Sequence, residues 1–483
     1  PQDGEVFPAT LRATDLTKLK YTVREMPATP LQEALRLGRT AQNLKRNAEG
    51  EKDAEEKARL IKKAALRQKQ ALAEAPKLFK DGFNKYVDDP HVFDAALAAA
   101  QLATKYRIGR EQLAGIIAKA DEAAISYGRR WHLEFNAKIA GALANQKDYA
   151  DLALDIAARL DKEVVGGDAG GLRARALKAL AAAQASAGHP EAAKEALDRL
   201  GDVEAMLDRD YRERVPPFKA DVFKGRKGAS DRTVVLELFT GVQCPPCVAA
   251  EVAFDALHKT YQPADLVLIQ YHLHIPGPDP LTNADSEVRS KYYGKAFPDY
   301  AGGVPNTFFN GKPEAAGGGA IADAEGKYRQ YRQVIDPLLE TDSAAKLSVA
   351  AMRQDNMINI QAEVAGLKKP GSDIRLRLLL VEETIRFVGG NRVRFHHDVV
   401  RSLVGGADGF ALTEKNSKHT ATVDVDALRR SLGAYLDEYE RDWQPFPNSD
   451  RPLDLAKLRV IALVQDDATR EILQAALVDV VER

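Results

Sequence analysis

The spacing of apolar residues changes twice along this chain of 483 residues, and this change limits the possible fold more than any other feature. From about Leu31 to Leu200, apolar residues recur at intervals of three and four, which is the pattern of amphipathic helices. From about Thr233 the pattern becomes short apolar runs, and beyond about Asp342 it becomes alternation with a period of two. These patterns predict a multidomain α+β chain in which a helical part precedes two parts that contain β-strands.

Residues 1–214 are predicted to form an N-terminal α-helical array. Short polar turns at residues 146–150 and 188–192 each lie between Ala-rich helices, which indicates stacked helical hairpins. This arrangement resembles tetratricopeptide-type repeats, and a protein partner is expected for the array. The helices are expected at residues 31–47, 54–75, 92–106, 110–126, 131–144, 149–160, 172–187 and 191–200.

Residues 343–483 are predicted to form a C-terminal antiparallel β-sandwich. Short runs of alternating apolar and polar residues are separated by turns rich in Gly, Pro and Asn, which is typical of an all-β domain. One helix is expected inside this part at residues 427–441, and a strand buried on both faces at residues 458–464.

Charge and hydropathy exclude several classes of partner. The 69 Lys and Arg residues nearly balance the 70 Asp and Glu residues, so overall charge predicts neither nucleic acid nor an anionic membrane as a ligand. No run approaches the ~18 apolar residues of a membrane span, so no transmembrane segment is expected. The sequence opens with Pro1 and has no leader, which indicates a processed or trimmed chain.

The only two cysteines, Cys244 and Cys247, form a Cys-Pro-Pro-Cys motif. A loop this short cannot brace a long chain, so the pair is expected to be a redox or metal device. The motif lies between an apolar strand expected at residues 233–239 and a helix expected at 248–259, and a second strand is expected at 266–271. This order predicts a right-handed βαβ unit with parallel strands.

The position of the motif at a helix start predicts its chemistry. A thiolate attacks disulfides, and a helix that begins near Pro245 would lower the pKa of the Cys244 thiol through its positive end. Proline suits the first helical positions because no N–H partner is needed there. Cys247, one turn further on, lies within reach of a mixed disulfide. We therefore expect Cys244, with its sulfur unshielded at the helix tip, to attack and Cys247 to resolve.

The strand, the Cys-Pro-Pro-Cys motif and the later segment at residues 303–309 together resemble the thioredoxin superfamily, from residue 231 to about 339. The resemblance implies a central thioredoxin-like α/β domain at residues 215–342 that needs no cofactor. It also implies a cis bond before Pro305, with the proline facing the cysteines and the backbone at Val304 holding the substrate.

The same resemblance implies a buried acid beneath the cysteines that relays protons. Glu237 is the only acid in the strand and is the candidate, although it lies one residue further from Cys244 than in the family. A solvent-facing Glu237 at the strand edge is the alternative, because burial of an unpaired carboxylate is unfavourable. Gln243 replaces the tryptophan common before the first cysteine and is expected to contact substrate.

His272 and His274 follow the second strand and are expected near the cysteine pair, both on one face. Two thiols and two imidazoles could form a Cys2His2 site, but walls of the substrate groove are the preferred interpretation and no metal is predicted. His396 and His397 should face opposite sides of a strand, with structural roles.

Residues 279–286 and 292–294 add a resemblance to bacterial envelope proteins that have a thioredoxin-like core and a downstream β-sandwich. It implies an extracytoplasmic location, periplasmic or secreted, where disulfide chemistry is permitted. The predicted function is thiol–disulfide oxidoreduction on protein or small thiol substrates. Two alternatives stay open: a non-enzymatic multidomain adaptor with a thioredoxin-like scaffold, and a copper or zinc chaperone that uses the cysteine pair and the nearby histidines.

Overall fold

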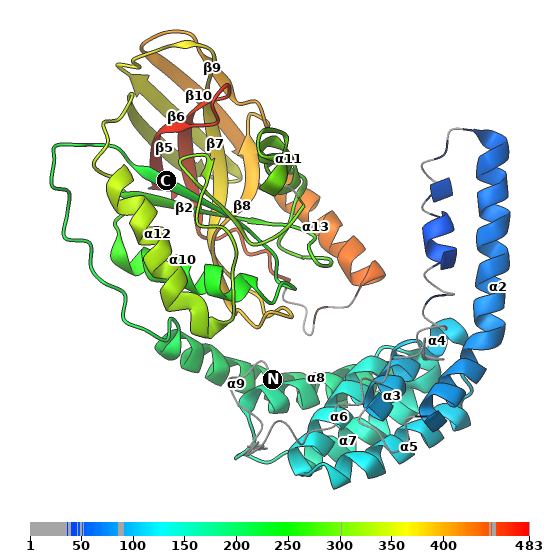
Figure 1. Ribbon diagram of the computed structural model, residues 1–483. Helices are drawn as coiled ribbons and strands as arrows, with labels where there is room; N and C mark the ends of the chain where they lie inside the picture. The colour runs from blue at the N-terminus through cyan, green and yellow to red at the C-terminus, as the bar shows by residue number, and fades with distance from the viewer. Residues whose placement is uncertain are drawn as a thin grey trace, which may run out of the picture. The chain divides into compact units, whose positions relative to one another are not determined.

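The protein is a mixed α and β structure, with a helical region first and sheets in the C-terminal part (Figure 1). The computed structural model describes residues 36, 40–45, 47–48, 51, 53–85, 91–300, 302–443, 446 and 451–482. The chain divides into two compact units, whose described residues fall at 36–210 and at 211–482. Among the described residues, no helix is both long and apolar enough to cross a bilayer.

The first unit consists of helices packed along the chain. In α5, Leu113, Ile116, Ile117, Ala120 and Ala124 are buried, which is the three-and-four spacing of one helical face. The predicted helices between residues 54 and 200 are confirmed, while the one expected at 31–47 lies largely outside the described residues. The helices are α2 (Ala54–Lys85), α3 (His91–Gln101), α4 (Ala103–Tyr106), α5 (Arg110–Ser126), α6 (Arg129–Leu143), α7 (Ala150–Glu163), α8 (Gly170–Ser186) and α9 (Pro190–Arg214), with a 3₁₀ turn at Lys147–Tyr149.

The second unit is built on a twisted sheet that contains nine of the described strands, in the order β12-β11-β7-β8-β2-β1-β3-β4, with β9 paired to β7. β1 and β2 are parallel and α10 connects them, so the predicted βαβ unit is confirmed. The strands are β1 (Val234–Thr240), β2 (Leu266–His272), β3 (Asn306–Phe309), β4 (Lys312–Pro313), β7 (Gly371–Arg386), β8 (Phe395–Val404), β9 (Phe410–Leu412), β11 (Leu458–Asp466) and β12 (Ile472–Asp479).

Both faces of β1 are covered, which explains its nearly continuous apolar run. Leu236 and Leu238 pack against α10 (Cys247–Thr260) and α12 (Ala324–Leu338), which lie side by side on one face (Figure 1). Val235 and Phe239 face the other way, toward α11 (Ala284–Ala296) and apolar residues of β7 and β11. Short 3₁₀ turns at Pro298–Tyr300 and Ile321–Asp323 complete this part.

A second sheet of four described strands covers part of the first, in the order β10-β6-β5-β13. Alternate residues of β6, such as Ile358 and Ile360, pack against Leu376 and Leu378 of β7. The strands are β5 (Lys346–Gln354), β6 (Met357–Ala365), β10 (Ser417–Asp424) and β13 (Val481–Glu482), and α13 (Val425–Asp442) matches the helix expected at 427–441.

The larger sheet joins strands from both sides of the boundary predicted at residue 342. β2 pairs in parallel with β8 at Gln270 and Val399, so the C-terminal strands extend the sheet that begins with β1 and β2. The hairpin of β7 and β8 is thereby placed beside the segment that carries the cysteines.

Candidate functional site

Cys244 and Cys247 are joined by a disulfide, with their Cα atoms 5.4 Å apart. We call residues 241–247 the cysteine turn. The Cys244 N–H donates to the Gly241 carbonyl at 2.9 Å, and the Cys247 N–H donates to the Cys244 carbonyl at 3.2 Å. Helix α10 begins at Cys247, which is one residue before the expected range of 248–259 and two residues after Pro245, because residues 245–246 form a turn. The pair nevertheless lies at the N-terminal end of this helix, as expected.

The sulfur of Cys244 is less open than predicted. Cys244 is 2% exposed and Cys247 is fully buried, whereas Pro245 and Pro246 are exposed. Cys244 Sγ lies 3.7 Å from the carbonyl oxygen of Val304. The neighbouring backbone therefore shields a sulfur that the sequence places at a free helix tip.

The bond between Val304 and Pro305 is cis, which confirms the prediction for this segment. Pro305 is buried and is followed by β3, which pairs antiparallel with β1. The proline segment and the cysteine turn thus lie together, with the Val304 carbonyl directed at Cys244 Sγ.

A glycine segment that the sequence analysis did not single out forms a second wall of the cysteine turn. The Gly319 N–H donates to the Pro246 carbonyl at 2.7 Å, and the Ala249 N–H donates to the Gly319 carbonyl at 3.0 Å. A Cβ atom on Gly318 would lie 1.8 Å from the Pro246 carbonyl oxygen and 2.7 Å from Pro305 Cγ, so only glycine fits there. The run of small residues at 315–320 was the available signal.

Gln243 is engaged by the loop between β7 and β8. Its Oε1 accepts from the Gly390 N–H at 3.2 Å, and the Asn391 N–H donates to the Val242 carbonyl at 2.9 Å. Gln243 is half-buried. The predicted substrate-contacting side chain therefore holds the C-terminal hairpin against the cysteine turn.

Glu237 is fully buried, so the alternative of a solvent-facing Glu237 is wrong. Alternation along β1 places it on the face opposite α10, away from the helix that carries Cys247. Its carboxylate accepts from Arg289 Nε at 2.8 Å and Nη2 at 3.0 Å, and from the hydroxyls of Tyr271, at 2.9 Å, and Tyr293. Burial opposes the charge on Arg289, but Glu237 outweighs it and raises the pKa of Arg289. Glu237 is thus held in a buried ion pair.

A different carboxylate, Glu251, lies close to the cysteine turn. It is on α10, one turn beyond Cys247, and is 1% exposed. It accepts from Thr240 Oγ1 at 2.7 Å and from Asn391 Nδ2 at 3.2 Å, and it lies 2.9 Å from His396 Nδ1. The spacing of four residues from Cys247 was a usable signal that the sequence analysis did not take up.

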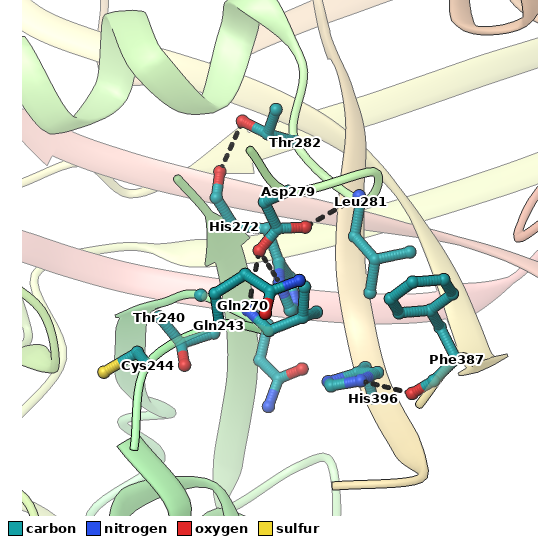
Figure 2. Close-up of polar contacts among 12 residues, drawn as sticks. Thr240, Gln243, Cys244, Gln270, His272, Asp279, Leu281, Thr282, Phe387 and His396 are labelled. Atoms are coloured by element: carbon teal, nitrogen blue, oxygen red, sulfur yellow. Dashed lines mark hydrogen bonds and ion pairs between the residues drawn. The ribbon is translucent and has the colours of Figure 1, made fainter. Parts of the chain in front are cut away.

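The structure separates the two histidines of the predicted pair. β2 ends at His272, so alternation does not continue to His274 and the two imidazoles do not share a face. His272 is buried and its Nδ1 lies 3.0 Å from Asp279 Oδ2 (Figure 2). His274 is exposed, and its ring lies beside that of Tyr435. In the part of the chain that the structure describes, no three His, Cys, Asp or Glu residues are placed to hold a metal ion.

The prediction that His396 and His397 face opposite sides of a strand is not confirmed, because both side chains lie against α10. His396 is buried against Glu251 and donates to a backbone carbonyl, while His397 Nε2 lies 3.7 Å from Asp255 Oδ1, one helical turn further along α10. Burial, followed by the charge on His396, lowers the pKa of His397 to about 4. His397 is therefore neutral near pH 7.

Comparisons with known proteins give only distant similarities. No family model and no curated protein matches the sequence. HBP35 of Porphyromonas gingivalis is 12% identical with a TM-score of 0.36, over 53% of this chain and 77% of that one. The crystal structure of a protein from Agrobacterium tumefaciens is 15% identical with a TM-score of 0.31, over 53% of this chain and 96% of that one.

Proposed function

We propose that this protein is a thiol–disulfide oxidoreductase with a thioredoxin-like core, which uses Cys244 and Cys247 on protein or small thiol substrates. The observation that carries the proposal is the disulfide at the start of α10, with Cys244 Sγ 3.7 Å from the Val304 carbonyl beside the cis Pro305. A βαβ unit at the sheet centre supports the same assignment. The helical array and the β-sandwich are proposed as flanking parts, and the location as extracytoplasmic, since disulfides persist there.

The reaction follows from the positions of the two sulfurs. A substrate thiolate attacks Cys244 Sγ, a mixed disulfide forms, and the bonding electron pair of the Sγ–Sγ bond goes to Cys247, which then takes up a proton. A second substrate thiolate attacks the substrate sulfur of the mixed disulfide and releases Cys244 as a thiolate. The substrate leaves oxidised and the cysteine pair reduced, and the reverse sequence reduces a substrate disulfide.

The test compares turnover of an insulin disulfide by the full chain and by two single variants. Cys244→Ser is expected to abolish turnover. Cys247→Ser should instead accumulate a mixed disulfide through Cys244, because the sulfur that resolves it is gone. The two variants are matched controls for each other, as each removes one sulfur from the same turn. Equal turnover by the parent and by Cys244→Ser would refute the proposal.

The burial of Cys244 favours a second candidate, a non-enzymatic scaffold in which the disulfide is a fixed clasp. A clasp has no need of a reachable sulfur. Alkylation by iodoacetamide after reduction separates the two: the oxidoreductase requires that Cys244 reacts much faster than Cys247. Equally slow alkylation of both cysteines under native conditions would favour the clasp.

A further inference from the structure

A buried line of charged and polar groups crosses from α10 to the C-terminal strands behind the cysteine turn. It begins at Glu251, one helical turn beyond Cys247, and continues to His396 on β8, which is 145 residues further along the chain. The Thr240 hydroxyl and the Asn391 amide also donate to this carboxylate. Both ends of the cysteine turn are thus tied to the same buried group, because Thr240 precedes the turn and α10 follows it.

The hydrogen bonds of His396 assign its charge. Nδ1 lies 2.9 Å from Glu251 Oε2. Nε2 lies 3.1 Å from the carbonyl oxygen of Phe387 (Figure 2). An imidazole whose two nitrogens both face acceptors needs a hydrogen on each, so His396 is a cation. Burial lowers the pKa of His396, but the charges and hydrogen bond of Glu251, with a smaller contribution from Asp279, outweigh it and raise the pKa overall.

The line continues through His272 to Asp279. The rings of His272 and His396 have centroids 4.9 Å apart, and His272 Nδ1 lies 3.0 Å from Asp279 Oδ2. Asp279 also accepts from the N–H groups of Val242, within the cysteine turn, and Leu281, each at 2.8 Å (Figure 2). A carboxylate that accepts this many hydrogen bonds is ionised.

One nitrogen in this line has no hydrogen-bond partner among the described residues. His272 is fully buried and its Nε2 is unpaired, whereas its Nδ1 faces Asp279 Oδ2 at 3.0 Å. The buried line therefore has a carboxylate at each end and two imidazoles between them.

Two further titratable groups near His396 have shifted pKa values. Burial, followed by the charge on Glu251, raises the pKa of Asp255 well above its ordinary value. His397 is neutral because its pKa is lowered to about 4. The groups that face His396 are Glu251 and Asp255 from α10, His272 from β2, Asp279 from the segment after β2, and His397 from β8 itself.

We propose that Glu251, His396, His272 and Asp279 form an acid–imidazole chain that sets the redox poise of the Cys244–Cys247 pair. This inference rests on the proposed redox role of the cysteines. Reduction leaves a thiolate or a thiol at Cys247, one turn from the Glu251 carboxylate. Two negative charges in a buried site repel each other, so Glu251 favours the disulfide and the His396 cation favours the dithiol. The C-terminal strands, which supply His396 and Asn391, are then part of the redox machinery.

The test is an equilibrium titration of the full chain with reduced and oxidised glutathione, in which alkylation and mass spectrometry measure the fraction of dithiol. Glu251→Gln removes the negative charge and should shift the equilibrium constant toward the dithiol about tenfold, or about 30 mV. His396→Gln should shift it in the opposite direction. The matched control is His397→Gln, the next residue on β8. His397 lies 3.7 Å from Asp255 and its pKa is lowered to about 4, so the substitution removes no charge near pH 7 and should stay within twofold of the parent.

The pH dependence gives a second readout. Between pH 5.5 and 8.5, the parent and the His397→Gln variant should show the same slope of potential against pH, and the Glu251→Gln variant a different one. The double variant Glu251→Gln/His396→Gln leaves no lone buried charge from this pair and should lie between the two single variants. It also keeps the test usable where a single variant does not fold.

The proposal is overturned by variants that all stay within twofold of the parent, or by shifts of Glu251→Gln and His396→Gln in the same direction. Failure of the proposed function is distinguished by the insulin assay, because the glutathione equilibrium can be measured without turnover of a protein substrate. A parent that is no faster than Cys244→Ser in insulin reduction, yet shows the opposed shifts, would refute the enzyme and support the chain.

Discussion

The buried ion pair between Glu237 and Arg289 provides the sharpest test of the physical reasoning. The family resemblance implies that Glu237 relays protons, whereas the structure holds it in an ion pair on the sheet face opposite α10. The substitution Glu237→Gln separates these roles. It keeps the size of the side chain but removes the negative charge that Arg289 needs.

The expected effect on stability follows from burial. Arg289 is 2% exposed and Glu237 is 0% exposed, so the variant leaves a guanidinium ion without its counter-ion in a dry site. Removal of one partner from a buried pair reduces the free energy of unfolding by about 3–5 kcal/mol. Arg289 keeps its hydrogen bond to Gln465 at 2.8 Å, which does not compensate for a missing charge. The double variant Glu237→Leu/Arg289→Met removes both charges and should recover most of the loss.

Urea unfolding of the full chain, followed by near-UV circular dichroism, measures this loss as a shift of the transition of the second unit. Insulin reduction by the folded variant measures any effect on the redox pair, and it should stay within about threefold of the parent because Glu237 does not face the cysteine turn. A variant that loses less than 1 kcal/mol of stability, yet loses most of its turnover, would show that Glu237 is a relay and that the structural reasoning is wrong.

Three further substitutions test other parts of the structure. Gly318→Ala should lower stability by about 1–3 kcal/mol and slow insulin reduction, because its Cβ would lie 1.8 Å from the Pro246 carbonyl oxygen. The control Gly326→Ala, whose Cβ would meet no atom within 4 Å, should change neither stability nor turnover. Burial raises the pKa of Asp398 to about 7, so the native state holds a proton that the unfolded state has released between pH 4 and 7. The free energy of unfolding of the parent must then fall as pH rises through this window, by up to about 4 kcal/mol relative to that of Asp398→Asn. Urea titrations at several pH values measure this difference. Equal pH dependence of the free energy of unfolding in the two proteins would contradict it. Tyr149→Phe should destabilise the helical unit by about 1–2 kcal/mol, because it removes the hydroxyl that donates to the Ile108 carbonyl at 2.5 Å and leaves that carbonyl unpaired. An unchanged midpoint of thermal unfolding would rule this out.

Sequence patterns predicted the parts of this fold that depend on local signals. Apolar periodicity located the helices of the first unit and the strand, helix and strand around the cysteines. The residues that determine these elements lie within one element or next to it. The cis bond before Pro305 was instead implied by the resemblance to the thioredoxin superfamily, and it is confirmed.

The parts that could not be predicted depend on partners far apart in the sequence. The sequence left open whether Glu237 is buried or faces solvent, because nothing in its strand indicates that Arg289, 52 residues later, supplies the counter-charge. Glu251 lies on a helix face that reads as ordinary core until β8 places His396 against it. A carboxylate's role is set by what neutralises it, and a single sequence does not reveal that partner.

The shared sheet explains why the cysteine turn depends on residues that come more than a hundred positions later. A parallel pair such as β1 and β2 leaves an edge of unpaired backbone groups at β2, and β8 covers that edge by pairing at Gln270. Once β8 is there, its hairpin with β7 must lie against the cysteine turn, where Asn391 donates to the Val242 carbonyl. The strand that completes the sheet therefore also delivers the groups that surround the disulfide. For this reason, the chemistry of the cysteines cannot be separated from the C-terminal strands, although the sequence pattern places the two in different domains.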